Sequence, residues 1–256
     1  MRTVIKIGTS TLTYLNGNLN LKRFESLCKV IADIKNAGNQ VAVVSSGAIA
    51  LGKSKLGLSS RPADVPSKQA AAAVGQCELM CFYDREFSRY HHNVAQMLVT
   101  AEDLRGGERS VNFGNTAEKL LSMGALPVIN ENDTVATAEI SAGDNDTLSA
   151  LVAVAVKADL LILLSDIDGL YTADPHSDKT ARLIPVVENI TAELESAAGG
   201  SVSGVGTGGM ATKLQAAKIC TAAGCDMVIA NGAEPENLYK IIAGESAGTR
   251  FTGKKL

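Results

Sequence analysis

The run Leu160-Leu161-Ile162-Leu163-Leu164 is apolar at every position. A strand with one face in water alternates apolar and polar residues, whereas a strand buried on both faces does not. This run therefore predicts a strand inside a largely parallel sheet that is covered on both sides. Similar β-rich apolar runs occur at 4–7, 40–44, 94–99, 126–129 and 227–230.

The segments between most of these runs have the periodicity of helices. Between the first two runs one helical face is apolar, and Gly38 follows it where a C-terminal cap is expected. The apolar residues of that face are Phe24, Leu27, Cys28, Ile31 and Ile34. Ser67 is the expected N-cap of a long helix that runs toward Arg89, and further helices are expected over 111–123, 148–156 and 214–223. Strands that alternate with helices predict an α/β fold with helices on both faces of the sheet.

The composition excludes several classes of partner. A chain of 256 residues with 46% hydrophobic residues can form one compact domain. Its formal net charge is −3 and its basic residues form no block, so we expect no nucleic-acid partner. No apolar stretch approaches the thickness of a bilayer and the start has no secretory h-region, so we expect a cytoplasmic protein without membrane contact.

The cysteines give no metal signal. The chain has five of them and three histidines, and Cys77 and Cys81 lie one helical turn apart. Cys220 and Cys225 do not have the spacing of a zinc ribbon. Buried free thiols, and no protein-bound metal, are the expectation.

Lys6 is the first unusual residue at a predicted strand end, where ligands bind in open parallel sheets. It interrupts an apolar strand just before Gly8. Because a lysine is almost never buried without a partner, either an internal carboxylate or a bound anion must compensate its charge. Gly8 also lets a ligand approach the backbone, so a ligand site at this edge is favoured.

Three further clusters follow predicted strands or precede a predicted helix. Residues 45–47 read Ser-Ser-Gly, and their amides and hydroxyls suit either an anionic substrate group or an ordinary helix start. Residues 130–133 read Asn-Glu-Asn-Asp, and residues 143–147 read Gly-Asp-Asn-Asp-Thr. One acidic cluster alone could be a helix cap, whereas two at the same sheet edge as Lys6 indicate a binding site.

A glycine-rich segment completes the pattern. Residues 204–213 read Gly-Val-Gly-Thr-Gly-Gly-Met-Ala-Thr-Lys, and the Ser-Asp-Ile-Asp-Gly motif begins at Ser165. Backbone amides of such a loop, together with Lys213, can cradle phosphates. The segment is not a P-loop, because Thr212 precedes the lysine and Leu214 follows it.

The same segment also contains the letters of a dinucleotide-binding fingerprint, in Gly204, Gly206 and Gly209. No apolar strand precedes these glycines, and Asp226 begins the next strand instead of ending it. A dinucleotide-dependent oxidoreductase is therefore disfavoured.

Taken in order, these motifs resemble the amino acid kinase family over essentially the whole chain. They are Lys-Ile-Gly-Thr-Ser (6–10), Ser-Ser-Gly-Ala-Ile (45–49), Ile-Asn-Glu-Asn-Asp (129–133), Gly-Asp-Asn-Asp-Thr-Leu-Ser-Ala (143–150), Ser-Asp-Ile-Asp-Gly-Leu-Tyr-Thr-Ala-Asp-Pro (165–175) and Thr-Gly-Gly-Met-Ala-Thr-Lys (207–213). The resemblance implies a three-layer α/β/α sandwich around a mainly parallel eight-stranded sheet. It also implies a single domain over 1–256, without the C-terminal PUA domain that many glutamate-phosphorylating members carry.

The resemblance further implies the activity and the residues that carry it. ATP with Mg²⁺ would phosphorylate the side-chain carboxylate of L-glutamate, giving L-glutamyl 5-phosphate and ADP, the first step of proline biosynthesis. The implied catalytic residues are Lys6, Lys213 and Asp146, and the implied glutamate-binding residues are Ser46, Asp133 and Asn145. The implied ATP-binding residues are Lys6, Ser165, Asp166, Thr207, Gly208, Gly209, Met210, Ala211, Thr212 and Lys213, with the magnesium ion carried by the phosphates.

These residue types suit phosphoryl transfer to a carboxylate. A glutamate side chain with a pKa of about 4.3 is already ionised at neutral pH, so no catalytic base is required. The remaining difficulty is the approach of two anions, which Lys6 and Lys213 would relieve while Asp146 holds both ammonium groups. Asp133 can pair with an α-ammonium group, and Asn145 offers amide donors and an acceptor.

Other readings of the chain remain open at this point. Kinases of the same fold act on N-acetylglutamate, aspartate, carbamate or UMP, and a nucleotide sensor without catalysis is conceivable.

The expected partners follow from the product and from the surface. The reactive acyl phosphate implies hand-over to a reductase, glutamate-5-semialdehyde dehydrogenase. Exposed apolar helix residues would support a homo-oligomer, either a dimer or a tetramer.

Overall fold

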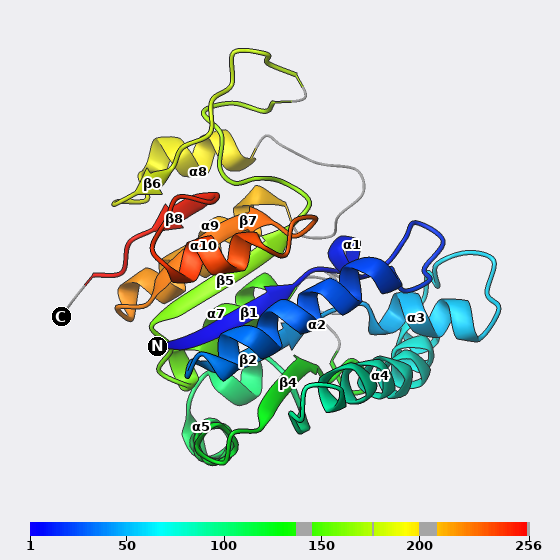
Figure 1. Ribbon diagram of the computed structural model, residues 1–256. Helices are drawn as coiled ribbons and strands as arrows, with labels where there is room; N and C mark the ends of the chain where they lie inside the picture. Colours follow the sequence, from blue (N-terminus) through cyan, green and yellow to red (C-terminus); the bar gives the residue numbers. More distant parts are fainter. Residues whose placement is uncertain (137–144, 176, 200–208, 255–256) are drawn as a thin grey trace.

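The computed structural model describes residues 1–136, 145–175, 177–199 and 209–254. One sheet lies between two layers of helices, and all of its central strands point toward the same edge (Figure 1). The expected three-layer sandwich with a mainly parallel sheet is confirmed. In the described part of the chain, no helix is both long and apolar enough to cross a membrane.

The sheet has eight strands in the order β3-β4-β2-β1-β5-β7-β8-β6. Neighbouring strands are parallel except for β7 and β8, which pair antiparallel. The strands are β1 (Arg2–Ile7), β2 (Gln40–Ser45), β3 (Val94–Val99), β4 (Leu126–Glu131), β5 (Leu160–Ser165), β6 (Val186–Val187), β7 (Asp226–Asn231) and β8 (Thr249–Phe251). The six predicted runs all form strands, whereas the short strands β6 and β8 were not predicted.

The helices connect these strands across both faces. They are α1 (Thr9–Leu12), α2 (Leu21–Asn36), α3 (Ala48–Lys55), α4 (Val65–Ser88), the 3₁₀ turn η1 (Glu102–Leu104), α5 (Gly107–Ser122), α7 (Asp146–Ala155), α8 (Ala192–Gly199), α9 (Met210–Ala222) and α10 (Asn237–Ile242). Gly38 follows α2 with φ +90°, as expected of a residue that closes a helix.

The predicted cap of the long helix α4 was wrong. Asp64, not Ser67, is the N-cap, and its side chain accepts a hydrogen bond of 2.9 Å from the backbone N–H of Ser67. Asp64 has extended backbone angles, and Pro66 lies in the first turn, where a missing N–H costs nothing. Ser67 therefore lies inside the helix as the residue that is capped.

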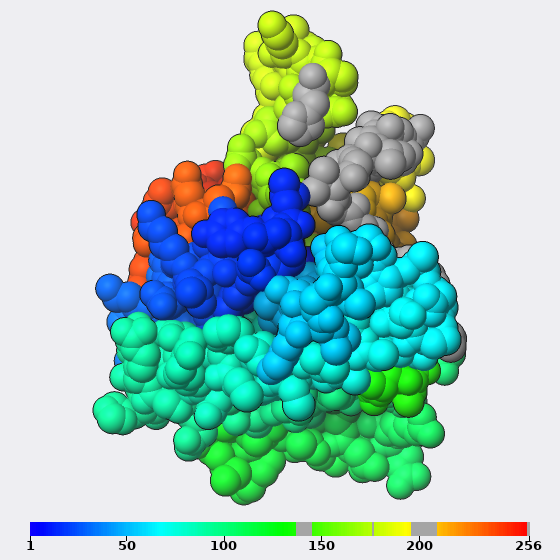
Figure 2. Space-filling model, turned by 90° about the vertical axis from the view of Figure 1, so that its right-hand side faces the viewer, coloured from blue at the N-terminus to red at the C-terminus, as the bar shows by residue number. Residues whose placement is uncertain are grey.

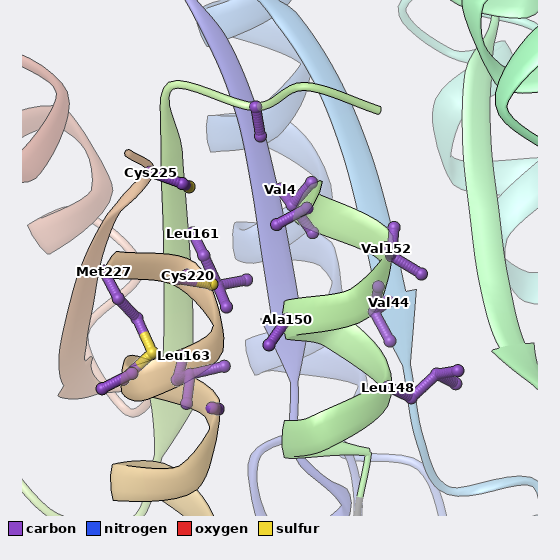
Figure 3. Close-up of a cluster of buried hydrophobic side chains, with 14 of the residues drawn as sticks. Val4, Val44, Leu148, Ala150, Val152, Leu161, Leu163, Cys220, Cys225 and Met227 are labelled. Carbon is purple, nitrogen blue, oxygen red and sulfur yellow. The ribbon is translucent and has the colours of Figure 1, made fainter. Parts of the chain in front are cut away.

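The sheet separates two hydrophobic cores. One core contains side chains of α2, α3, α4 and α10, and the other contains side chains of α5, α7 and α9. Figure 3 shows the second core, where Val4, Val44 and Leu163 of the central strands face α7 and α9. Alternate residues of β1, such as Val4 and Ile5, enter opposite cores, which explains why the central strands are apolar throughout.

Helices α3 and α4 cross in backbone contact through two glycines. A Cβ atom at Gly52 would lie 1.8 Å from the carbonyl oxygen of Ala71, and one at Gly75 would lie 1.8 Å from that of Ala48. No side chain fits at either position. Since α3 begins directly after Gly47, this contact fixes the turn that follows β2 against α4.

The cysteines are free, and two of them are not where they were expected. Cys28, Cys220 and Cys225 are buried, whereas Cys77 and Cys81 are exposed on α4. Their spacing of one turn places them together on a face of α4 turned away from the sheet, which sequence spacing alone did not reveal.

Candidate active site

One cavity of about 480 Å³ lies where β1, β2, β4 and β5 end. Predicted site residues that line it are Lys6, Ser46, Asp133, Asn145, Ser165, Asp166 and Lys213. Figure 2 shows the face of the molecule onto which these strands point, with the N-terminal segment (blue) beside the segment around α3 (cyan). There a Cβ atom at Gly17 would come within 2.9 Å of the Ala50 carbonyl oxygen, so the two segments touch.

Asp146 joins the two predicted catalytic lysines. Its Oδ1 lies 2.6 Å from Nζ of Lys6, and its Oδ2 lies 3.1 Å from Nζ of Lys213. Lys6 comes from the central strand β1, Lys213 from the first turns of α9, and Asp146 from the first turn of α7. The fold thus brings together three residues that are far apart in the sequence, and the partner that Lys6 requires includes an internal carboxylate.

The carboxylate of Asp146 is fully buried yet ionised. Burial raises the pKa of a carboxyl group, but here the charges and hydrogen bonds of Lys6 and Lys213 hold the pKa of Asp146 well below its usual range. The hydroxyl of Thr212 also donates to Oδ2 of Asp146 at 3.0 Å. Both lysines are at least nine-tenths buried while they line the cavity, so their ammonium groups have fixed positions at its wall.

Asn145 precedes Asp146 and is oriented by two acceptors. Its Nδ2 donates to the backbone carbonyl of Ser45 at 2.7 Å and to Oδ1 of Asn130 at 2.8 Å. Both amide hydrogens are therefore used in hydrogen bonds within the protein. The expectation that Asn145 offers donors to a substrate was wrong. Its Oδ1 makes no hydrogen bond among the described residues, so Asn145 presents an acceptor to the cavity.

Ser46 and Gly47 form the turn between β2 and α3. Gly47 has φ +96° and ψ −2°, a left-handed conformation that favours glycine. It is also the N-cap of α3, where no side chain accepts a hydrogen bond from the first amides. Residues 46–50 line the cavity, so the positive end of α3 lies at its wall and suits an anionic group.

Asp133 lies two residues beyond the end of β4 and lines the same cavity as Lys6. Its side chain lines the cavity and is partly buried. Burial raises the pKa of Asp133 to about 6, and the nearby positive charge of Arg61 opposes that rise. Burial therefore destabilises the ionised form of Asp133 until a cation binds beside it.

The predicted ATP-binding residues are only partly placed. Ser165 and Asp166 line the cavity at the end of β5. Gly209 is the N-cap of α9, and Met210, Ala211 and Thr212 form its first turn next to Lys213. Thr207 and Gly208, and the start of the 143–147 cluster, lie outside the described residues.

Gly8 leaves room for a phosphate beside Lys6. A Cβ atom at Gly8 would lie 3.7 Å from Nζ of Lys6 and 3.4 Å from the carbonyl oxygen of Leu164. Any side chain there would occupy the space beside the ammonium group. Gly8 and two buried lysines line the cavity and suit a polyphosphate chain, and Lys213 lies in the first turn of α9, whose first amides receive no side-chain cap from Gly209.

A model of the family described as "Amino acid kinase family" matches residues 1–231. The chain belongs to the amino acid kinase family. The match spans every strand from β1 to β7 and all the site residues described above, and the family indicates that the chain is a kinase.

Relatives within the amino acid kinase family are similar over most of their length. A glutamate 5-kinase of Clostridium perfringens is 50% identical over 258 residues, covering 99% of this chain and 96% of the relative. A glutamate 5-kinase of Clostridium tetani is 52% identical and covers 98% and 94%. A glutamate 5-kinase of Carboxydothermus hydrogenoformans is 54% identical, covering 99% of this chain and 68% of the relative.

Solved structures show the same fold at low identity. A UMP kinase from Bacillus anthracis has a TM-score of 0.67 at 18% identity and covers 99% of this chain and 96% of its own. A T. acidophilum isopentenyl phosphate kinase product complex has a TM-score of 0.65 at 18% identity, covering 98% and 100%. These likenesses support the amino acid kinase fold alone.

Sequence reasoning missed three residues that hydrogen-bond Ser45 or Asn145, or a partner of these residues. Asn130 was quoted within a motif but given no role, and Gln76 and Tyr83 of α4 were not considered. Asn130 accepts from Asn145, Gln76 accepts from Asn130 at 2.9 Å, and the Tyr83 hydroxyl lies 2.9 Å from Oγ of Ser45. The sequence signal for Gln76 is a polar residue on a helix face that continues with Leu79, Tyr83 and the buried Glu86, so it does not distinguish Gln76.

Proposed function

We propose that this chain transfers the γ-phosphoryl group of ATP to the side-chain carboxylate of L-glutamate, the first step of proline biosynthesis. The products are L-glutamyl 5-phosphate and ADP. The observation that carries the proposal is the pair of buried lysines held on one carboxylate at the wall of a cavity. The glutamate 5-kinases that are half identical to this chain support glutamate as the substrate.

The reaction needs no proton transfer. A carboxylate oxygen of glutamate forms a bond to the γ-phosphorus while the bond from that phosphorus to the β–γ bridging oxygen breaks, and ADP leaves with the electron pair. Because the nucleophile is ionised at neutral pH, the barrier is mainly positioning and mutual repulsion of anions. Lys6 and Lys213 oppose that repulsion from fixed positions, and Asp146 keeps them there.

Other residues that line the cavity recognise the amino acid. Asp133 pairs with the α-ammonium group of glutamate, and Oδ1 of Asn145 accepts a hydrogen bond from the same group. Ser46 and the first amides of α3 bind the α-carboxylate. This division of tasks leaves the side-chain carboxylate free to face the lysines.

Mg²⁺ arrives on the phosphates of ATP in this proposal. The described residues contain no group of three or more His, Cys, Asp or Glu side chains that could hold a metal ion. A cation that keeps several waters and binds phosphate oxygens needs few protein ligands, and Asp166 is a carboxylate at the cavity wall. When bound, the ion neutralises charge on the β- and γ-phosphates.

The reactivity of the product indicates which enzyme would act next. An acyl phosphate is hydrolysed readily by water, so a reductase that consumes it, a glutamate-5-semialdehyde dehydrogenase, is the proposed partner. We also propose a cytoplasmic homo-oligomer, with exposed apolar residues such as Val111 of α5 and Met123 at its C-cap available for contacts between copies.

The raised pKa of Asp133 predicts a pH dependence of glutamate binding. The ammonium group needs the ionised carboxylate, whose pKa in the free enzyme is about 6. The KM for glutamate should stay flat from pH 8 to 7 and then rise about tenfold for each unit below 6. Steady-state kinetics at pH 5 to 8 measures this, with the KM for ATP as the internal control. A KM for glutamate that is constant down to pH 5 contradicts the role of Asp133.

Substrate identity is tested by trapping the acyl phosphate. Purified chain, ATP, Mg²⁺ and hydroxylamine are incubated in parallel with glutamate, N-acetylglutamate, aspartate and carbamate, and UMP is tested by ADP release. Glutamate alone should give a strong hydroxamate signal. N-acetylglutamate at an equal rate, or ADP release with UMP only, defeats the proposal and points to another member activity of the family.

A further inference from the structure

Gln76 is a buried polar residue of α4 that does not line the cavity. It is 8% exposed and lies on the helix face that packs toward the sheet, two turns before Tyr83. Its Oε1 accepts a hydrogen bond of 2.9 Å from Nδ2 of Asn130. Its Nε2 is buried and has no hydrogen-bond partner among the described residues.

Gln76 is the first of three amides that are hydrogen-bonded in series with one polarity. Nδ2 of Asn130 donates to Gln76, and Oδ1 of Asn130 accepts from Nδ2 of Asn145 at 2.8 Å. The same Oδ1 accepts from the backbone N–H of Glu131 at 2.9 Å. Each amide thereby fixes which end the next one presents. The last atom of the series is Oδ1 of Asn145, at the cavity.

Stability alone does not account for a glutamine at this position. An amide with a buried, unpartnered N–H₂ group destabilises the fold relative to an apolar side chain of similar size. The reverse orientation of Gln76 would set its Nε2 against Nδ2 of Asn130, two donors facing each other. Gln76 is therefore held with one donor unsatisfied so that it can supply an acceptor to Asn130.

We propose that Gln76 is a positioning residue that sets the amide orientation of Asn145 through Asn130, and so gives the site its selectivity for a free α-ammonium group. Without the acceptor, Asn130 keeps a buried donor with no partner and rotates to find one, which removes its Oδ1 from Asn145. Asn145 then keeps only the Ser45 carbonyl as an acceptor for its Nδ2, and it can turn that group toward the substrate, where it repels the ammonium group. This inference rests on the proposed function.

The experiment is a double-mutant cycle in the full chain with glutamate as substrate. Gln76→Met keeps the length of the side chain and removes the acceptor. We expect the KM for glutamate to rise about tenfold, since the transmitted effect is one hydrogen bond to a charged group, while kcat and the KM for ATP change less than threefold. In an Asn145→Ala background the same substitution should change the KM for glutamate less than twofold.

Two further variants separate positioning from general damage to the fold. Phe87→Leu removes buried apolar volume from the same helix, but leaves the amide series and the hydrogen bond of Tyr83 to Ser45 intact. It should lower the melting temperature and leave the KM for glutamate within threefold. Gln76→Glu retains the acceptor oxygen, replaces the unpartnered nitrogen and should also stay within threefold, which keeps the proposal testable if Gln76→Met does not fold.

Each outcome decides the proposal. An equal rise in KM for Gln76→Met in both backgrounds, a fall in kcat without a rise in KM, or a tenfold rise in Gln76→Glu would overturn it. These results are distinct from a failure of the proposed function, in which the unmodified chain itself gives no hydroxamate with glutamate.

Discussion

Lys6→Ala should lower kcat at least a hundredfold, with a smaller change in the KM for ATP or glutamate. The ammonium group lies at the cavity wall, where it faces the phosphoryl group whose charge spreads in the transition state. A fixed charge in a site shielded from water contributes about 3 kcal/mol to such a transition state, which corresponds to more than a hundredfold in rate. Lys213→Ala is expected to have an effect of the same size. Steady-state kinetics with both substrates measures it.

The control for this prediction is a lysine–carboxylate pair elsewhere on the chain. Lys55 hydrogen-bonds Glu78 between α3 and α4, away from the cavity. Lys55→Ala should keep kcat within twofold. Because Asp146 retains one lysine in either cavity variant, both variants should fold, and thermal melting checks this. Near-normal turnover in Lys6→Ala or Lys213→Ala would rule out their proposed roles.

Asp133→Ala should raise the KM for glutamate about a hundredfold, because the α-ammonium group then enters a partly buried site without its counter-ion. A comparison with glutarate, which has no ammonium group, isolates the effect. The unmodified chain should prefer glutamate strongly, and Asp133→Ala should lower the efficiency with glutamate while leaving that with glutarate within threefold. The ratio of the efficiency with glutamate to that with glutarate should therefore fall.

Asp84→Ala serves as the matched control for that comparison, since Asp84 is exposed on α4 and does not line the cavity. It should leave both substrates unaffected. If Asp133→Ala lowers the efficiency with glutamate and with glutarate in equal proportion, Asp133 supports the loop and does not bind the ammonium group.

The parallel sheet explains how much of the site could be predicted from the sequence. Carboxyl ends of parallel strands meet at one edge, so residues such as Lys6, Asp133 and Ser165 could be grouped although they are more than thirty residues apart. A lysine inside an apolar strand also demanded a partner. That this partner includes Asp146 was implied by the family resemblance, because no spacing rule joins residues 140 positions apart.

Other features depended on contacts that no sequence pattern contains. Asn145 donates to Asn130 and to the Ser45 carbonyl, and Asn130 in turn donates to Gln76, a residue of a helix on the other side of the sheet from α7. Strand β8 is three residues long and β6 only two, too short for any hydrophobic period, and they exist because β7 offers an edge to pair with. At the start of α4, Asp64 and Ser67 are both good caps, and only the extended backbone of Asp64 distinguishes them.

Lys6, Asp146 and Lys213 are held in one hydrogen-bonded arrangement before any ligand arrives. All three side chains are buried, so water does little to screen their charges. The work of stripping water from these groups and aligning them is completed once, while the chain folds, and it is not repeated in each catalytic cycle. An incoming γ-phosphate thus meets an electric field that already has its final direction.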